Sequence, residues 1–436
     1  MPESQDRKST SPARPLDVLL PTLGSAGDVH PMIELGLALR GRGHRATIIT
    51  NPWFEEQIRD TGLEFIPLGT TEEAHATRAD ARLWKHMQAF QCVAERILIP
   101  NLSRLYLIIR ERRLGNTVVA ASGLCLGARV AQEKLGVPLA TVHLQPSLIR
   151  TLFDGGCMGR ARVDASIPRF LKRAFYWLAD NALIDRLLAP SLNTFRAALG
   201  LAPVRGIFRE YLQSPQLVLG FFPDWFAPLQ PDWPPNTHMV GFVLHDDGAR
   251  RTVTEDVEEF LAAGPPPILF TPGSAASMLG EFFRESVEAC RISGFRAMLV
   301  TNFPEQLPRD LPGDVRAFSY LPFSEVLPHC AALVHPGGIG TCAQGLKAGI
   351  PQIVVPHSND QPDNAFRIGR IGAGARIFPE RYKAPRVART LAHLIESPEI
   401  RARCAEFGQR VDSEASVNRA CELIEILCRG STVTKE

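Results

Sequence analysis

The chain has 436 residues, of which 45% are hydrophobic and 22% charged, with 48 basic and 46 acidic side chains. This composition is typical of a globular protein of two or three domains, and it excludes a disordered chain, a collagen and a coiled coil. The near balance of charge argues against a dedicated nucleic-acid binder. Nine cysteines without a C-x-x-C pair indicate a reducing compartment, the cytoplasm.

The first half of the chain alternates between short apolar runs and amphipathic segments. Residues 1–14 are polar and mixed in charge, so we expect a flexible tail there and no signal peptide. No apolar run reaches the ~18 residues that a membrane-spanning helix needs. From residue 16 onward the alternation predicts α/β units with a parallel sheet. The expected strands are 16–22, 45–50, 63–68, 117–121, 138–143 and 216–222, and the first helix is expected over 31–42.

The second half repeats this organisation. Residues 222–235 are rich in Pro and Trp, which suits a stiff linker. Further strands are expected at 268–271, 296–301, 331–334 and 352–355, and the last ~45 residues are expected to be helical. The fold class is therefore α/β, with two facing Rossmann-like domains and a cleft between them where ligands bind. We place the domains at 15–235 and 236–415, with a C-terminal helix over 416–436 that packs back toward the first domain.

A glycine-rich segment, GSAGDVHP over residues 24–31, lies between the first strand and the first helix. Its glycines allow a tight turn and a close approach of the backbone to a ligand. The alternative is a plain loop in which Asp28 caps the helix. A nicotinamide or flavin site is the minor alternative, because the spacing is G-x-x-G and the second strand ends in Thr50 and Asn51 without an acid.

A second glycine-rich segment, VHPGGIGT over residues 334–341, again joins a strand to a helix. Gly337, Gly338 and Gly340 allow backbone N–H groups to approach a phosphate, and the helix N-terminus adds partial positive charge. His335 can donate a hydrogen bond to a phosphate oxygen. The alternative is a core turn with a buried histidine.

Two further loops are expected at the same edge of the second sheet. The segment PHSNDQPDN over 356–364 offers Asp360 and Gln361, a carboxylate and an amide that can bind sugar hydroxyls. The alternative is a helix N-cap with a proline in the first turn. The segment TPGS over 271–274 adds the hydroxyl of Ser274.

Several other chemistries have no motif in this sequence. It contains no G-x-S-x-G nucleophile elbow, no H-E-x-x-H and no Cys/His zinc spacing. It also contains no Asp-x-Asp pair. We therefore expect no bound metal, and any phosphate chemistry would depend on helix ends and side chains.

Together these segments resemble the GT-B glycosyltransferases, in particular the family-1 nucleotide-sugar enzymes. Residues 335–374 are similar to the donor-binding signature of that family, and GSAGDVHP is similar to its acceptor-side loop. Within the family, LGARVAQEKLGVPL and QPDWPPNTHMVGF are similar to the rhamnosyltransferases of rhamnolipid synthesis. The resemblance implies that the N-terminal domain binds the acceptor and the C-terminal domain binds the nucleotide sugar.

The resemblance also implies residue roles. Asp28 takes the place of the general base, with His30 as a back-up. The donor diphosphate is expected at His335, Ser274, Gly337, Gly338, Gly340 and Thr341, the donor sugar at Asp360 and Gln361, and the nucleobase near Tyr320 and Phe323. Two departures leave the base, uracil or thymine, open: Tyr320 replaces a family tryptophan, and Ala343 replaces the glutamate that holds the ribose.

The implied function is an inverting, metal-independent transfer of a hexose, rhamnose or glucose. The donor would be a dTDP-sugar or UDP-sugar, with no other cofactor. The acceptor would be an apolar hydroxy compound such as a hydroxyacyl lipid of the rhamnolipid type; a sterol, polyketide or other natural-product aglycone is the alternative. A non-catalytic nucleotide-sugar or lipid binding protein on the same scaffold is a further alternative.

Apolar residues in the first half are candidates for the acceptor pocket. Trp84, Met87 and Phe90 follow helical spacing, and Leu144 and Phe153 follow later. The alternative for these residues is ordinary core packing. No nucleic-acid partner is expected.

Residues 159–179 interleave arginine and lysine with bulky apolar side chains, which predicts a weak, salt-sensitive contact with the inner face of a membrane. The alternative is a cationic solvent face over a buried apolar stripe.

Overall fold

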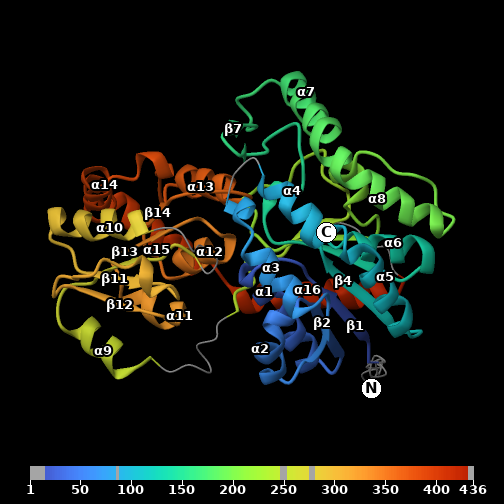
Figure 1. The fold of residues 1–436 in the computed structure, drawn as a ribbon, viewed down its shortest axis with the longest axis horizontal. Helices are drawn as coiled ribbons and strands as arrows, with labels where there is room; N and C mark the ends of the chain where they lie inside the picture. The colour runs from blue at the N-terminus through green and yellow to red at the C-terminus, as the bar shows by residue number, and fades with distance from the viewer. Residues whose placement is uncertain (1–14, 85–87, 246–252, 274–279, 431–436) are drawn as a thin grey trace, which may run out of the picture.

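The computed structural model describes residues 15–84, 88–245, 253–273 and 280–430. The expected tail over 1–14 lies outside these ranges. The described residues form two α/β domains, each built on a parallel sheet with helices packed against it (Figure 1). The predicted fold class of two Rossmann-like domains is therefore confirmed.

The first sheet has seven strands in the order β3-β2-β1-β4-β5-β8-β9, all parallel. In that order they span Glu64–Pro67, Arg45–Thr50, Asp17–Pro21, Thr117–Ser122, Leu139–His143, Leu217–Gly220 and Thr237–Met239. Strand order reverses beside β1, which pairs with both β2 and β4. The GSAGDVHP segment leaves the sheet at this switch point, where open α/β sheets bind ligands.

The second sheet has six parallel strands in the order β12-β11-β10-β13-β14-β15. They span Val315–Phe318, Ala297–Val300, Ile268–Phe270, Ala332–His335, Gln352–Val354 and Gly374–Arg376. The segments after β13 and β14 leave it at the carboxyl edge. A short antiparallel hairpin, β6 (Cys157–Met158) and β7 (Ala161–Arg162), projects from the first domain.

The helices connect these strands. Those that precede β9 are α1 (Ala26–Gly41), α2 (Glu55–Asp60), α3 (Thr71–Arg78), α4 (Ala89–Val93), α5 (Asn101–Arg112), α6 (Leu126–Leu135), α7 (Arg169–Ala179) and α8 (Asp185–Ala198). Those that follow are α9 (Glu255–Ala262), α10 (Gly280–Ser293), α11 (Phe323–Val326), α12 (Ile339–Lys347), α13 (Gln361–Arg370), α14 (Ala384–Glu396), α15 (Pro398–Arg410) and α16 (Ser413–Cys428). Within the described ranges, no helix is both long and apolar enough to cross a membrane.

Helix α1 begins at Ala26, five residues before the expected start at Pro31. Ser25 and Asp28 form a capping box at this end, in which the Ser25 N–H donates to Asp28 Oδ2 at 2.8 Å. The cap starts the helix directly after the glycine turn. Asp28 therefore lies in the first helical turn and not in a loop.

Residues 222–235 are part of the first domain and not the expected linker. Phe222, Phe226 and Trp233 are buried in its core, and the Trp233 indole N–H donates to the Ile149 carbonyl at 3.1 Å. Strand β9 follows and pairs with β8, so the first sheet extends past the expected limit at 235. The Pro-rich composition reflects a packed irregular segment.

The last helix returns to the first domain. Helix α16 packs against α1, β4 and β5, and Figure 1 shows it in red among the blue elements. Its Glu425 accepts from Arg42 Nε at 2.7 Å and lies 3.0 Å from His44 Nε2. The bond to Arg42 is the main cause that lowers the Glu425 pKa to about 2.

One apolar cluster joins the two domains. Met32 and Ile33 of α1 belong to the same buried cluster as Ile339 and Leu346 of α12. Helices α1 and α12 also contact each other directly. Because each helix begins at the carboxyl edge of its sheet, this packing brings the two glycine-rich segments toward each other.

Candidate active site

Asp28 lies at the start of α1 and is half-buried. It accepts from the Ser25 N–H at 2.8 Å and lies 3.3 Å from Ser25 Oγ. Burial by the surrounding protein raises the pKa of Asp28 to about 6, although the bonds from Ser25 oppose the shift. A carboxyl with a pKa near neutrality is suited to accept a proton at physiological pH.

His30 does not converge with Asp28. Positions two apart on an α-helix point about 200° apart. His30 Nε2 lies 3.1 Å from the side-chain nitrogen of Gln57, and its ring packs 5.3 Å from the ring of His245. The predicted back-up residue thus faces α2 and the inter-domain segment.

His335 ends β13 and is fully buried. Its Nε2 lies 2.9 Å from Gln352 Oε1, and its Nδ1 accepts from the Gly337 N–H at 3.2 Å. Burial lowers the pKa of His335 to about 4, so the ring is neutral at pH 7. Both ring nitrogens are occupied inside the protein, so His335 orders the loop instead of facing a phosphate as expected.

The glycines after β13 have different surroundings. Gly337 has φ +98°, and a Cβ at this position would lie 2.5 Å from Val354 Cγ1. A Cβ at Gly338 or Gly340 would meet no atom within 4 Å, so the backbone borders open space there. Gly338 is the N-cap of α12, and Thr341 lies in its first turn. A helix N-terminus facing open space can receive an anionic group.

Asp360 is the N-cap of α13. Its Oδ2 accepts from Asn364 Nδ2 at 2.7 Å, and the same nitrogen donates to the Gly337 carbonyl at 2.9 Å. Burial raises the pKa of Asp360 to about 7, and the charge of Asp28 is the second-largest cause. Carboxyl groups from the two domains therefore lie within electrostatic reach of each other.

Gln361 is partly engaged by its own loop. Its Oε1 accepts from the His357 N–H at 2.8 Å and the Ser358 N–H at 3.1 Å. These bonds orient the side chain and leave its amide nitrogen as the group that can donate to a sugar hydroxyl. Asn359, just before Asp360, has φ 55°, a left-handed conformation that asparagine tolerates.

Sequence reasoning did not identify Asn364 or Gln352. Asn364 is buried and links the loop after β13 to the loop after β14, while Gln352 holds the His335 ring. The spacing of four between Asp360 and Asn364, which places them on one helix face, is the signal that could have identified Asn364. No such local signal connects Gln352 with His335, which lies on the neighbouring strand.

The remaining predicted donor residues lie in different surroundings. Tyr320 follows the carboxyl end of β12 and is 37% exposed, so its ring can stack on a base. Phe323 begins α11 and packs on the core of the second domain. Ser274 lies outside the described residues.

Within the described ranges, no group of three or more His, Cys, Asp or Glu side chains is placed to hold a metal ion.

The predicted acceptor residues are not gathered into one pocket within the part of the chain that the structure describes. Trp84 ends a 3₁₀ turn and Phe90 lies in the separate helix α4, while Met87 is outside the described residues. Phe90 packs edge-to-face on Phe208 with centroids 5.6 Å apart.

Leu144 and Phe153 also have other surroundings. Leu144 is buried and borders a hollow of about 20 Å³ beside Gly340, too small for an acceptor. Phe153 lies under the guanidinium of Arg169, whose Cζ is 3.9 Å from the ring centroid. Ordinary packing therefore describes Phe90 and Leu144.

Known proteins share this architecture. The family described as "Glycosyltransferase family 28 N-terminal domain" matches residues 18–153, and "Erythromycin biosynthesis protein CIII-like, C-terminal domain" matches residues 294–427. The crystal structure of the glycotransferase of kitacinnamycin matches with a TM-score of 0.72 at 20% identity, over 95% of this chain and 99% of that one, and shows the same fold.

Curated relatives match over nearly the whole chain. The O-mycaminosyltylonolide 6-deoxyallosyltransferase of Streptomyces fradiae is 30% identical over 94% of this chain and 96% of its own length. A sterol 3-beta-glucosyltransferase of Arabidopsis thaliana is 24% identical over 93% of this chain and 67% of its own length. The chain is therefore an enzyme and belongs to the GT-B glycosyltransferases of the erythromycin biosynthesis protein CIII-like type.

Proposed function

We propose that this glycosyltransferase transfers a hexose from a nucleoside diphosphate sugar to an apolar acceptor with inversion, and that Asp28 is the general base. The observation that carries the proposal is that α1 and α12 contact each other across the domain boundary, with Asp28 within electrostatic reach of Asp360 and the N-terminus of α12 bordering open space. The first domain would hold the acceptor and the second the donor.

In this mechanism the acceptor hydroxyl lies beside Asp28. Its oxygen attacks the anomeric carbon from the face opposite the diphosphate, and its proton passes to the Asp28 carboxylate. The bond between the anomeric carbon and the diphosphate oxygen breaks, and the diphosphate leaves with the electron pair. The N–H groups at the start of α12 stabilise the growing negative charge.

The donor sugar would be bound by Asp360 and the amide nitrogen of Gln361. With a pKa of about 7, Asp360 can accept or donate a hydrogen bond at neutral pH. Tyr320 would stack on uracil or thymine. A thermal-shift panel of uridine and thymidine diphosphates and their sugars tests the donor, because a ligand that binds only the folded state raises the melting temperature.

For the acceptor we propose a macrolide-type or sterol aglycone, which the names of the two curated relatives favour. A hydroxyacyl lipid is the second candidate. Mass spectrometry of reactions that offer a 3-hydroxy fatty acid, a macrolactone and a sterol together decides between them. A polar aglycone glycosylated faster than all three would contradict an apolar acceptor. Release of nucleoside diphosphate from the donor without acceptor separates an enzyme from a binding protein.

Helix α7 supports a proposed contact with a membrane. Phe170, Trp177 and Leu178 are 70%, 59% and 58% exposed, whereas Lys172 is buried and its Nζ donates to the carbonyls of Phe153 and Asp164. The alternative of a cationic solvent face over a buried apolar stripe is therefore wrong for α7. Lys172 and Tyr176 lie on its inner face, and Phe170 and Trp177 are exposed.

We propose that this face of α7 contacts an anionic bilayer on the cytoplasmic side. Arg169 and Arg173 flank the apolar residues, and the one acid between residues 165 and 184, Asp180, is buried against Arg150. Sedimentation with anionic vesicles tests it. Pelleting of the wild type should persist in part at high salt and be lost in the double variant Phe170→Ser, Trp177→Ser. Equal pelleting of both proteins would contradict the contact.

A further inference from the structure

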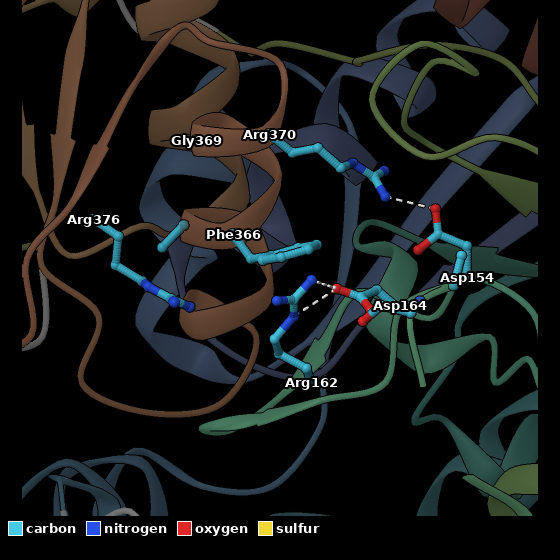
Figure 2. A pocket seen from close by; sticks show the side chains of 10 residues that line it. Asp154, Arg162, Asp164, Phe366, Gly369, Arg370 and Arg376 are labelled. Carbon is cyan, nitrogen blue, oxygen red and sulfur yellow. Dashed lines mark hydrogen bonds and ion pairs between the residues drawn. The ribbon is translucent and has the colours of Figure 1, made fainter. Parts of the chain in front are cut away.

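A pocket of about 600 Å³ lies between the domains, and none of its lining residues belongs to the candidate active site. One wall is the segment around the β6–β7 hairpin, and the other is formed by α13 and the end of β15 (Figure 2). Phe366 on its wall lies six residues beyond Asp360, or about 9 Å along the helix axis. A pocket of this volume is in the range of small-molecule sites.

The walls of the pocket are held together by a buried network. The Cys157 N–H donates to Asp363 Oδ1 at 2.8 Å across the domain boundary. Asp363 in turn pairs with Arg367 at 2.8 Å, and both side chains are at most 2% exposed. The hairpin is thereby fixed against α13, so the pocket is preformed.

Three arginines line the pocket around Phe366 (Figure 2). Two are neutralised by carboxylates: Arg162 donates to Asp164 and Arg370 donates to Asp154 at 2.6 Å. The guanidinium of the third, Arg376, lies 4.7 Å from the ring centroid of Phe378, and it forms no ion pair with any described residue. Among the described lining residues, the pocket therefore contains one cation without a countercharge.

The rest of the lining is largely apolar or open. Ala165, Ala365 and Phe366 contribute apolar surface, and a Cβ built on Gly369 would meet no atom within 4 Å. A guanidinium pairs best with a planar anion that accepts two hydrogen bonds. We propose that this pocket binds a small carboxylic acid with an apolar chain, its carboxylate at Arg376 and its chain over Phe366 and Gly369.

Such a ligand would contact both domains at once. Because it would bind both walls of the pocket, such a ligand would add to the contacts that already hold the hairpin on α13. The proposal does not depend on the chemistry of the glycosyl transfer, so binding can be measured without donor or acceptor.

Isothermal titration with octanoate tests the site, with octanol and inorganic phosphate as the comparison probes. Arg376→Gln removes the charge, and Gly369→Leu fills the pocket. Gly41→Leu is the matched control, because Gly41 is also helical and a Cβ there meets nothing within 4 Å. Leucine favours a helix more than glycine does, so both leucine variants should fold, which thermal melting checks.

We expect octanoate to bind the wild type and Gly41→Leu equally, about tenfold or more weakly to Arg376→Gln, and not to Gly369→Leu. Octanol and phosphate should bind at least about tenfold more weakly than octanoate. Octanoate binding that survives Gly369→Leu would overturn the proposal, as would equal binding of octanol or phosphate. Absence of octanoate binding to the wild type would overturn it as well.

Discussion

The carboxyl groups of Asp28 and Asp360 come from opposite domains, and the charge on Asp28 helps to raise the pKa of Asp360 to about 7. Burial is the larger cause, and it also raises the pKa of Asp28 to about 6. Two carboxyls that influence each other and have such pKa values can divide their roles near neutral pH. The more acidic Asp28 is ionised and accepts a proton, while Asp360 can donate to the sugar.

The pH dependence of turnover follows from the Asp28 pKa. A general base acts only when ionised, so kcat/KM should rise with pH as Asp28 loses its proton around pH 6. Initial rates between pH 4.5 and about 8, at constant ionic strength, measure this limb. A flat profile over that range, in a protein that stays folded throughout, would rule out Asp28 as the titrating base.

The same carboxyls should lower the stability of the folded protein at neutral pH. Their folded-state pKa values lie above the unfolded value near 4, so the folded state binds more protons and wild-type stability falls as the pH rises from about 4 to 7. Asp360→Asn does not titrate. We expect it to be more stable than the wild type by ~1–2 kcal/mol at pH 8, allowing for solvent screening, and to lose this advantage near pH 4.

Thermal or urea unfolding of both proteins at the two pH values checks this difference. An Asp360→Asn protein that is equally or less stable than the wild type at pH 8 contradicts the raised pKa. Its rate of glycosyl transfer should nevertheless fall, since Asp360 is proposed to bind the donor sugar.

Gly337 and Gly340 should respond differently to substitution. Gly337→Ala places a Cβ 2.5 Å from Val354 Cγ1 at φ +98°, so we expect a loss of ~1–3 kcal/mol in unfolding free energy. A Cβ at Gly340 would meet no atom within 4 Å, so we expect Gly340→Val to change the melting temperature little. If the open space holds the diphosphate, Gly340→Val should weaken nucleoside diphosphate binding by about tenfold or more. Unchanged binding would place the diphosphate elsewhere.

Substitution of Asn364 should weaken donor binding through the two groups that its side chain holds. Its Nδ2 holds both the Gly337 carbonyl and the Asp360 carboxylate, so Asn364→Ala should cost ~1–3 kcal/mol of stability and raise the KM for the donor. Asn236→Ala is the control, because Asn236 Nδ2 donates to the Ser214 carbonyl away from the site. The control should lose stability without a change in KM; an equal change in both variants would indicate a general structural effect.

The sheets were largely predictable because their central strands are continuous buried apolar runs. Strand β2 matches its expected range, whereas β9, β12 and β15 were not predicted because none of them is a continuous buried apolar run. The start of α1 was placed too late because the reciprocal bonds between Ser25 and Asp28 outweigh the expectation that Pro31 opens the helix.

The orientation of side chains was the part that sequence reasoning could not supply. Helical spacing indicates which residues of α7 share a face, but the outward face depends on carbonyls of Phe153 and Asp164 that bind Lys172. Similarly, a histidine before a glycine-rich turn can face a phosphate or the protein. Gln352, on the neighbouring strand, directs His335 inward.

The most direct test of the account compares glycosyl transfer by the wild type and Asp28→Asn under single-turnover conditions. Asparagine keeps an oxygen for the Ser25 N–H but cannot take a proton, so the rate should fall by about 10²–10⁴ while the donor Kd stays within a few-fold. The wild-type product should have the inverted anomeric configuration by NMR. Transfer by Asp28→Asn within a few-fold of the wild-type rate, or a product with retained configuration, would contradict Asp28 as the base of an inverting transfer.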